Sequence, residues 1–324
     1  MYTFEELRHL VEDELVAMPL PKSPSNLYSP IKYALTQGGK RMRPVLTLMA
    51  CNIFSDNIKP AIKPALGLEI FHNFTLLHDD IMDCSDMRRG RPTVHTKWNN
   101  NIAILAGDGM AFLAAQYVAA APNNVADEVN AIFNQTAIEV CEGQQYDMDF
   151  ETSTAVYEKD YIEMIRLKTA VLPAACLQIG ALIGGADSEQ AKHLYNLGIN
   201  IGLAFQLQDD FLDVYSNAEV LGKPIGGDIV ENKKTFLLIK ALEKLDNIQR
   251  KDLLKYMADK SLVRYEKITY VTDLYTRLKV RESTDKKING FFNAAYNELS
   301  AMDVPHERLQ ILHDFVDMIA NRKK

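Results

Sequence analysis

Apolar residues recur every three to four positions along nearly the whole chain, which is the period of amphipathic α-helices. The sequence holds no convincing series of strands and turns. Thr3 and Glu6 match a capping box and predict a first helix that runs to about Met18. A second helix is expected to end at the Gly38–Gly39 turn. Later helices are expected to cover 41–54, 60–83, 101–121, 125–149, 157–184 and 188–215, with four or five more within 231–322. The pattern predicts an all-α fold.

The central helices are apolar nearly all round, which indicates that they are buried. A chain of 324 residues can form a large core. No linker and no internal repeat divides the sequence, so we expect a single helical domain over 1–324.

The helix expected over 60–83 changes character at its C-terminal end, where apolar residues give way to carboxylates. Asp79 and Asp83 would lie one turn apart on one face, with Asp80 beside them. Carboxylates this close repel each other, and a bound divalent cation removes that cost. Mg²⁺ prefers oxygen ligands and is usually shared with substrate phosphates. A solvated polar helix end is the alternative interpretation.

A second acidic motif repeats this spacing later in the chain, again after an apolar run. Its carboxylates are Asp209, Asp210 and Asp213. Two independent copies would arise by chance in roughly one of several hundred such chains, given the average frequency of aspartate. The pair therefore predicts a Mg²⁺–diphosphate site at the mouth of an apolar helical pocket.

Composition narrows the class of partner. Apolar residues make up 47% of the chain and charged residues 24%, as in ordinary soluble globular proteins. The formal net charge of −7 argues against nucleic acid. It leaves an anionic substrate open, because local clusters of charge decide that.

The compartment is also predictable. No run of eighteen apolar residues is present, so no membrane span is expected. The acidic, amphipathic N-terminus is unlike a signal or transit peptide. Four widely spaced cysteines without a CxxC pair are expected to be free thiols: Cys51, Cys84, Cys141 and Cys176. We therefore expect a cytoplasmic protein.

Cationic side chains accompany the acidic motifs. Three follow the Gly38–Gly39 turn, and Arg88 and Arg89 follow the first acidic motif. Arginine binds phosphate bidentately, and lysine offers a point charge. A solvated basic turn, or simple neutralisation of the aspartates, would explain the same residues. Further cations are Lys168, Lys223, Lys233 and Lys234; a lysine in mid-helix usually extends to solvent, but near a metal it can stabilise transition-state charge.

His72 and His78 both precede the first acidic motif, and His78 is directly next to Asp79. Most such histidines are hydrogen-bonded core residues, but they could also be metal ligands of a hydrolase that uses histidine and aspartate. That alternative explains neither the second acidic motif nor the basic sites.

Six segments occur together in one order: GGKRMRP, HNFTLLHDDIMD, RRGRPT, Lys168–Thr169, FQLQDDFLD and GKPIGGDIVENKKT. In order and spacing they resemble the trans-isoprenyl diphosphate synthases of the polyprenyl synthetase family over about residues 30 to 240. The resemblance implies a helical bundle around a deep central cavity, usually in a homodimer. It also implies Mg²⁺-dependent, head-to-tail (1′-4) condensation of isopentenyl diphosphate with an allylic diphosphate.

The resemblance also assigns residues. Metal binding falls to Asp79 and Asp83 on one wall and Asp209 on the other, with the motifs completed by Asp80, Asp210 and Asp213. Isopentenyl diphosphate binding falls to Lys40, Arg43, His72 and Arg89. Allylic diphosphate binding falls to Arg88, Lys168, Lys223 and Lys233, and Lys234 fits less well. Thr169 and Gln206 would face the reacting allylic carbon, so the expected catalytic residues are Arg88, Lys168, Thr169 and Gln206.

Product length is expected to depend on the helix that carries the first acidic motif. At 1.5 Å per residue, Phe74 lies roughly 7–8 Å below Asp79 and Phe71 roughly 12 Å below it. In the family, an aromatic residue five positions before the first aspartate goes with short products, and Phe74 fits that pattern. Thr75 departs from the paired aromatics of farnesyl-forming relatives. Geranylgeranyl diphosphate is therefore the favoured product and farnesyl diphosphate the next; plain core packing of both phenylalanines is the alternative.

Two related functions compete with this interpretation. A terpene cyclase on the same fold shares one acidic motif but needs no isopentenyl site, so the GGKRMRP segment argues against it. A non-catalytic regulatory paralogue would be expected to lose aspartates or arginines, and here both acidic motifs are intact.

Overall fold

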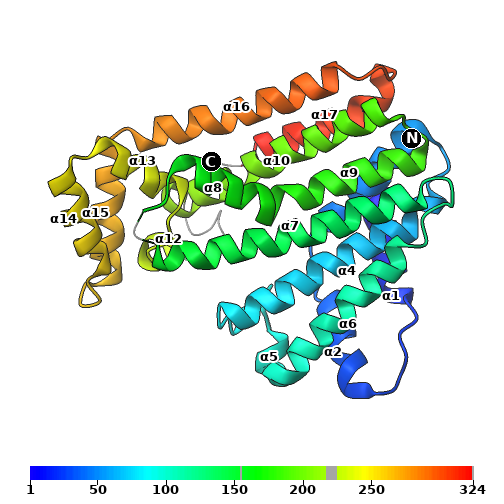
Figure 1. Ribbon diagram of the computed structural model, residues 1–324, viewed down its shortest axis with the longest axis horizontal. Coiled ribbons are helices and arrows are strands. Elements are labelled where there is room, and N and C mark those ends of the chain that lie inside the picture. Colours follow the sequence, from blue (N-terminus) through cyan, green and yellow to red (C-terminus); the bar gives the residue numbers. More distant parts are fainter. Residues whose placement is uncertain (154, 217–224, 323–324) are drawn as a thin grey trace. The chain divides into compact units, whose positions relative to one another are not determined.

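The chain is all-α, as the apolar periodicity predicts (Figure 1). The computed structural model describes residues 1–153, 155–216 and 225–322. Its helices are α1 (Phe4–Ala17), α2 (Ser25–Leu35), α3 (Met42–Phe54), α4 (Lys59–Met82), α5 (Val94–Lys97), α6 (Asn100–Val118), α7 (Ala126–Thr152), α8 (Glu158–Ile165), η1 (Arg166–Ala170), α9 (Val171–Gly184), α10 (Ser188–Tyr215), α12 (Gly227–Val230), α13 (Phe236–Lys244), α14 (Asn247–Ala258), α15 (Arg264–Arg277), α16 (Val280–Ser300) and α17 (His306–Ala320). The Thr3–Glu6 capping box opens α1 as expected.

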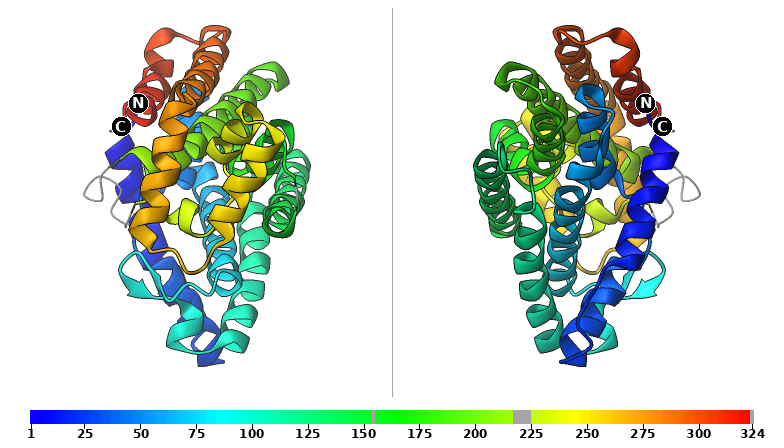
Figure 2. Two further views of the ribbon diagram at one scale, coloured as in Figure 1. Left: turned by 90° about the vertical axis from the view of Figure 1, so that its left-hand side faces the viewer. Right: turned by 90° about the vertical axis from the view of Figure 1, so that its right-hand side faces the viewer.

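Two local features were not predicted. The segment between α4 and α6 holds a short antiparallel hairpin, β1 (Met87–Arg88) and β2 (Arg91–Pro92), followed by α5. Its turn has positive φ at Arg89 and Gly90, a conformation that glycine adopts without strain. Figure 2 shows this hairpin beside α2, where the Tyr33 hydroxyl donates to the Pro92 carbonyl at 2.8 Å. Strands this short are too brief to produce a detectable alternation.

The helix expected over 157–184 is also interrupted. Residues Arg166–Ala170 form a π-helical turn, η1, in which the Val171 amide donates to the Arg166 carbonyl. Such turns are rare and often occur at functional sites. Apolar periodicity does not reveal one extra residue in a turn, and this turn contains Lys168 and Thr169.

The chain divides into two compact units. Unit 1 comprises Met1–Thr136, Ala175–Tyr195 and Met302–Leu312, and unit 2 comprises Ala137–Ala174, Asn196–Ala301 and His313–Lys324. The single domain expected over 1–324 stays a prediction.

Unit 1 is organised around α4. This helix packs most extensively against α6 and also against α3, and Figure 1 shows α4 and α6 side by side. Gly67 explains part of this closeness, since a Cβ there would lie 2.8 Å from the Ala114 carbonyl oxygen of α6. Leu68 and Ile70 of α4 and Met110 of α6 are fully buried. The packing holds the end of α4, where the first acidic motif lies.

Unit 2 contains a second core, which surrounds Tyr275 and is built from α10, α12, α13, α14, α15 and α16. The helix α10 approaches η1 and α9 closely. A Cβ at Gly202 would lie 2.5 Å from the Ala170 Cα, and a Cβ at Gly198 would lie 2.4 Å from the Ala174 Cα. Small residues therefore fix η1 against the helix that ends in the second acidic motif.

Among the described residues, two helical stretches are long and apolar enough to cross a membrane by length and composition alone, Asn100–Val118 and Glu158–Gly184. Buried helices of soluble proteins meet the same criterion, and 67% of the most apolar window in the second stretch is buried. In α6 the share is 33%. The expected absence of a membrane span stays a prediction. All four cysteines are free thiols, as expected.

Candidate active site

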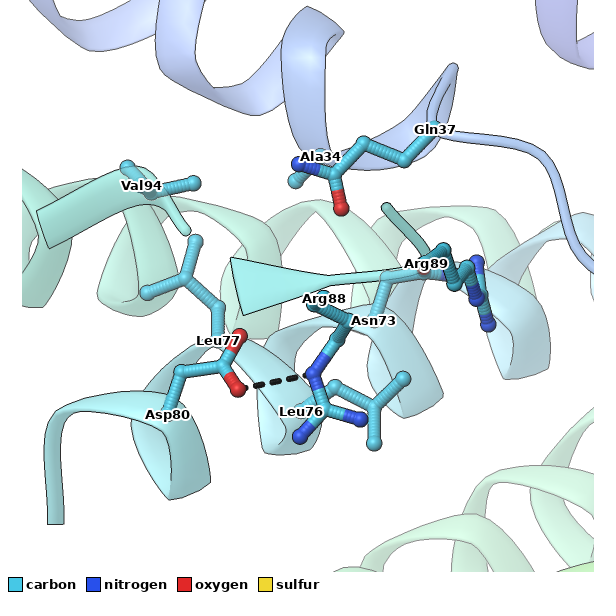
Figure 3. A pocket seen from close by; sticks show the side chains of 9 residues that line it. All are labelled: Ala34, Gln37, Asn73, Leu76, Leu77, Asp80, Arg88, Arg89 and Val94. Atoms are coloured by element: carbon cyan, nitrogen blue, oxygen red, sulfur yellow. Dashed lines mark hydrogen bonds and ion pairs between the residues drawn. The ribbon is translucent and has the colours of Figure 1, made fainter. Parts of the chain in front are cut away.

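The first acidic motif lies at the C-terminal end of α4. Asp80 is buried and accepts a hydrogen bond from the Arg88 Nε at 2.7 Å, drawn in Figure 3. Burial raises the pKa of Asp80, and the Arg88 guanidinium opposes that rise. Asp79 is partly buried, and Asp83, which ends the helix, is exposed. Arg88 therefore neutralises one aspartate through Nε, which is compatible with either role predicted for it.

A pocket in unit 1 lies beside this ion pair. It is lined by Ala34, Gln37, Asn73, Leu76, Leu77, Asp80, Arg88, Arg89 and Val94 (Figure 3). Its walls come from α2, α4, the hairpin and α5. The two arginines supply positive charge, and Gln37 and Asn73 supply neutral polar groups. Within this lining Arg88 is paired with the Asp80 carboxylate, and Arg89 donates to the Gly38 carbonyl.

His72 and Arg43 meet in the same unit. The Arg43 Nη1 lies 3.1 Å from the His72 Nε2. A guanidinium can only donate, so Nε2 accepts and His72 is a neutral ring with its proton on Nδ1. Burial, and then the charges of Arg43, Arg89, Arg88 and Arg41, hold the pKa of His72 well below its usual value. The residue is thus a neutral donor within a group of cations.

This low pKa predicts a pH dependence of stability. Below pH about 6.5 the unfolded chain binds a proton at His72 that the folded chain does not, so unfolding becomes easier as pH falls. We expect the unfolding free energy to drop with a slope of up to about 1.4 kcal/mol per pH unit from this group, and a His72→Asn variant to lose that part of the slope. Denaturant titrations between pH 5 and 8 measure it. His9→Asn, at an exposed position of α1, is the control for the effect of a histidine-to-asparagine substitution as such.

Arg41 has a structural role that separates it from its neighbours. It is buried, its Nη1 donates to the Glu69 carboxylate at 2.9 Å, and its Nη2 donates to the Leu35 carbonyl at 2.7 Å. Asn73 also donates to Glu69 at 3.1 Å. This buried network fixes the start of α3. Lys40, just before the helix, is exposed, and Arg43, in its first turn, reaches His72.

The two glycines of GGKRMRP accommodate Arg89. The Arg89 guanidinium donates to the Gly38 carbonyl. Gly39 has a φ of +137°, and a Cβ there would lie 2.8 Å from the Arg89 Nη1. Both the backbone conformation and the close approach therefore require glycine at this position.

A Gly39→Ala variant should consequently displace Arg89. If Arg89 holds isopentenyl diphosphate, as the family resemblance implies, we expect the KM for that substrate to rise about tenfold or more, the effect of losing one charge-assisted hydrogen bond of roughly 1.5–3 kcal/mol, while the KM for the allylic substrate changes little. Initial rates at varied concentrations of each substrate separate the two constants. Gly90→Ala is the control, because it also lies at positive φ (+74°) but has no atom within 4 Å of the added Cβ. Equal changes in both variants would contradict the assignment.

The second acidic motif in unit 2 belongs to a hydrogen-bonded chain that starts at η1. The Thr169 hydroxyl donates to the Gln206 Oε1 at 3.2 Å, and the Gln206 Nε2 donates to the Asp210 Oδ1 at 3.1 Å. The Tyr161 hydroxyl donates to the other oxygen of Asp210. Because the Asp210 carboxylate accepts from the amide nitrogen, the amide oxygen of Gln206 is turned towards Thr169.

Asp210 is the carboxyl group in this chain of hydrogen bonds, and its pKa lies well above the usual value. Burial raises its pKa to about 8, and the nearby charge of Asp228 adds to the rise. Hydrogen bonds from Tyr161 and Gln206 oppose it. A buried carboxyl held at both oxygens is suited to orienting its neighbours.

Lys168 is held in place from α7. Its Nζ lies 2.6 Å from the Asp147 Oδ2. Gly143, one turn earlier in α7, lets the two backbones meet, because a Cβ there would lie 2.2 Å from the Lys168 amide nitrogen. The ammonium and the Thr169 hydroxyl are thereby presented on one π-helical turn.

The other two aspartates of the motif have different partners. Asp209 pairs with Arg322 near the C-terminus at 2.8 Å. Asp213 is buried and accepts from the Asp228 amide at 3.0 Å, so it organises the start of α12. Among the described residues, no group of three or more His, Cys, Asp or Glu side chains is arranged to hold a metal by itself.

The remaining basic residues differ in availability. Lys233 is exposed and lies 3.1 Å from Glu231 and 3.8 Å from Asp228. Lys234 donates to the backbone carbonyls of Phe150 and Glu151. Lys223 lies outside the described residues.

The aromatic residues expected to limit product length separate into two kinds. Phe71 is 2% exposed and belongs to the core, whereas Phe74 is only partly buried. The Thr75 hydroxyl bonds back to the His72 carbonyl of its own helix at 2.9 Å. Phe74 and Thr75 are both partly buried, so these two of the three can border open space.

Sequence reasoning missed Asp147, Tyr161 and Arg322, the partners of Lys168, Asp210 and Asp209. No local spacing links these residues to the motifs they contact. The hydrolase alternative gains no support, because His72 faces Arg43 and the His78 Nε2 is bonded to the Ile104 carbonyl.

Comparison with known proteins identifies the family of this chain. The family described as polyprenyl synthetase matches residues 24–274. The geranylgeranyl diphosphate synthase of Sulfolobus acidocaldarius is 35% identical over 322 residues, which is 96% of each chain, and that of Methanosarcina mazei is 44% identical over 72% of this chain and 71% of its own. A crystal structure of a geranylgeranyl pyrophosphate synthase matches with a TM-score of 0.94 and 40% identity over the whole of both chains. The chain belongs to the polyprenyl synthetase family.

Proposed function

We propose that this protein is a Mg²⁺-dependent prenyltransferase that condenses isopentenyl diphosphate head-to-tail with allylic diphosphates. Geranylgeranyl diphosphate is the favoured product and farnesyl diphosphate the next. The observation that carries the proposal is the π-helical turn of unit 2, where a lysine ammonium and oriented oxygen dipoles occur together. Relatives named geranylgeranyl diphosphate synthase support the product.

The reaction begins with ionisation of the allylic substrate. The bond from its C1 to the diphosphate oxygen breaks, leaving an allylic cation and free diphosphate. Lys168 supplies fixed positive charge to the departing oxygens. The Thr169 hydroxyl and the Gln206 carbonyl offer negative dipole ends to the cation, and the Gln206 bond to Asp210 keeps its amide in that orientation.

Isopentenyl diphosphate then supplies the new carbon–carbon bond. Its double bond attacks C1 of the allylic cation, and a proton leaves the neighbouring carbon. We assign its diphosphate to the cations of unit 1, Lys40, Arg43 and Arg89, with the Nδ1–H of His72 as a neutral donor. The released diphosphate is the proposed base. Apolar side chains of α4, Phe74 among them, exclude water that would quench the cation.

Magnesium fits the acidic motifs by donor chemistry. Carboxylate oxygens are its preferred protein ligands, and it usually retains waters and substrate phosphate oxygens instead of binding an all-protein cage. Each motif suits that mode by itself, since Asp79 and Asp83 are one turn apart at the end of α4 and Asp209 opens the motif near the end of α10. When bound, the ion would act as a Lewis acid on the diphosphate.

A panel of primers tests the proposal. The protein is incubated with Mg²⁺ and isopentenyl diphosphate, and separately with dimethylallyl, geranyl or farnesyl diphosphate, and the products are identified by mass. We expect elongation with at least one primer. A cyclic hydrocarbon formed from an allylic diphosphate alone would favour a cyclase, and no elongation with any primer would defeat the proposal.

We also propose a homodimer formed through α6. This helix is apolar, yet large side chains on its outer face are exposed: Ile104 by 44%, Leu105 by 59% and Phe112 by 75%. Leu105, Asp108 and Phe112 follow one another on one face of the helix, and Ile104 lies beside Leu105, so the large apolar side chains form a stripe that the exposed Asp108 interrupts. An exposed apolar stripe of this kind is typical of an interface between subunits.

A Phe112→Glu variant should therefore dissociate. A charge buried without a partner in an interface costs several kcal/mol, so we expect the mass in light-scattering chromatography to fall from that of two chains to that of one. Val16→Glu is the control, because Val16 is 70% exposed on α1, outside the stripe. A wild-type protein that is already monomeric would contradict the dimer.

We propose a cytoplasmic location without a membrane span. The substrates are charged diphosphates, the apolar window in Glu158–Gly184 is largely buried, and a dimer would account for the exposed apolar face of α6.

A further inference from the structure

The histidine before the first acidic motif has a place that neither diphosphate nor metal binding explains. His78 precedes Asp79 in α4, and its Nε2 lies 3.2 Å from the Ile104 carbonyl oxygen of α6. A carbonyl only accepts, so Nε2 carries the proton and donates it. This nitrogen is committed to the neighbouring helix.

Gly107 of α6 provides a seat for the imidazole. A Cβ at this position would lie 2.2 Å from the His78 Nε2 and 2.5 Å from its Cδ2. Since no pair of heavy atoms tolerates such distances without a bond, only glycine lets the ring lie against the α6 backbone. Gly107 and the Ile104 carbonyl together fix where the imidazole sits.

The same imidazole contacts Phe74, which lies one turn earlier in α4. The ring centroids are 4.8 Å apart and the planes are inclined by 69°, an edge-to-face contact. On its other side Phe74 meets Phe71 at 5.5 Å, and Phe71 meets Phe133 of α7 at 5.4 Å. Phe74 is thus held between a core phenylalanine and a histidine anchored on α6.

We propose that His78 is a positioning residue for product length, acting through Phe74. The inference rests on the proposed function and on the expectation from the sequence that Phe74 limits the length of the product. A phenylalanine ring without a neighbour on one side can move to another rotamer, and in this position such a movement would open the pocket. Loss of the clamp should therefore lengthen the product by at least one five-carbon unit.

Four variants test this inference by two readouts, total incorporation of isopentenyl diphosphate and the distribution of product lengths. His78→Ala removes the clamp, Gly107→Ala drives the imidazole from its seat, and Phe74→Ala removes the closing ring. All three should shift products to longer chains. The double variant His78→Ala/Phe74→Ala should give the distribution of Phe74→Ala alone, because His78 acts through Phe74.

Gly109→Ala is the matched control on α6. Its added Cβ would meet only the Ile31 and Leu27 methyl groups, each at 3.4 Å, so product lengths should stay those of the wild type. Thermal melting by circular dichroism identifies any variant that fails to fold, and if His78→Ala does so, Gly107→Ala decides.

Two outcomes would overturn the clamp. One is wild-type lengths in folded His78→Ala or Gly107→Ala while Phe74→Ala gives longer products. The other is a double variant whose products exceed those of Phe74→Ala. Failure of the proposed function looks different, because the wild-type protein would then incorporate no isopentenyl diphosphate at all.

Discussion

A Lys168→Met variant should lose about two to three orders of magnitude in kcat while retaining its fold. Methionine keeps the length of the side chain but removes the charge. Removing one preorganised electrostatic group from a site of developing charge typically has an effect of this size. Negative charge develops on the leaving diphosphate only as the allylic bond breaks, so the KM for the allylic substrate should change much less than kcat.

The ion pair with Asp147 supplies the control for this variant. In Asp147→Asn the ammonium remains but loses the carboxylate that holds it at 2.6 Å, so we expect a smaller loss, within about tenfold. Steady-state rates with saturating isopentenyl diphosphate compare the two. A kcat of Lys168→Met equal to that of the wild type would show that Lys168 does not stabilise the transition state.

An Asp79→Ala variant should lose a similar factor, and its remaining activity should require more magnesium. Metal ions supply several kcal/mol of transition-state stabilisation, and each 1.4 kcal/mol corresponds to about tenfold in rate. We therefore expect kcat/KM to fall by about two to three orders of magnitude and the Mg²⁺ concentration for half-maximal rate to rise. Titrating the initial rate with Mg²⁺ measures both.

Asp86 provides a matched comparison in the same region. It is an exposed aspartate that follows the motif but is not part of it, so Asp86→Ala should stay within about twofold of the wild type. If Asp79→Ala shows the same magnesium dependence as Asp86→Ala, the first acidic motif does not bind the metal.

The acidic and basic motifs could be predicted from sequence because each is local. Asp79 lies in the last turn of α4 and Asp83 is its C-terminal cap, so the spacing of four residues places both on one face. The GGKRMRP segment likewise predicts a turn, and in the structure Gly39 has positive φ and lies directly against the Arg89 guanidinium. Helical periodicity also placed most helix boundaries within a few residues.

The features that escaped prediction depend on distant parts of the chain. The π-helical turn at Arg166–Ala170 depends on Gly143 and Gly202, which come from α7 and α10. Asp147, Tyr161 and Arg322 meet the predicted residues only after folding. Each strand of the hairpin at Met87–Pro92 has only two residues, which is too short to show an alternation of apolar and polar positions. Tertiary contacts of this kind leave no mark in a single sequence.

The clamp on Phe74 illustrates the same distinction. The sequence identifies an aromatic residue five positions before the first aspartate, but the role of His78 becomes apparent only from its contacts with Gly107 and Ile104. Sequence reasoning allowed either a hydrogen-bonded core histidine or a metal ligand, and the structure shows His78 hydrogen-bonded to the Ile104 carbonyl of α6.

The most direct test of the account is the mass of the product that the purified wild-type protein forms from dimethylallyl diphosphate, isopentenyl diphosphate and Mg²⁺. The account predicts a linear C20 prenyl diphosphate, with C15 as the main shorter species, and no product when the metal is chelated. Recovery of unchanged dimethylallyl diphosphate in the presence of Mg²⁺ would contradict it.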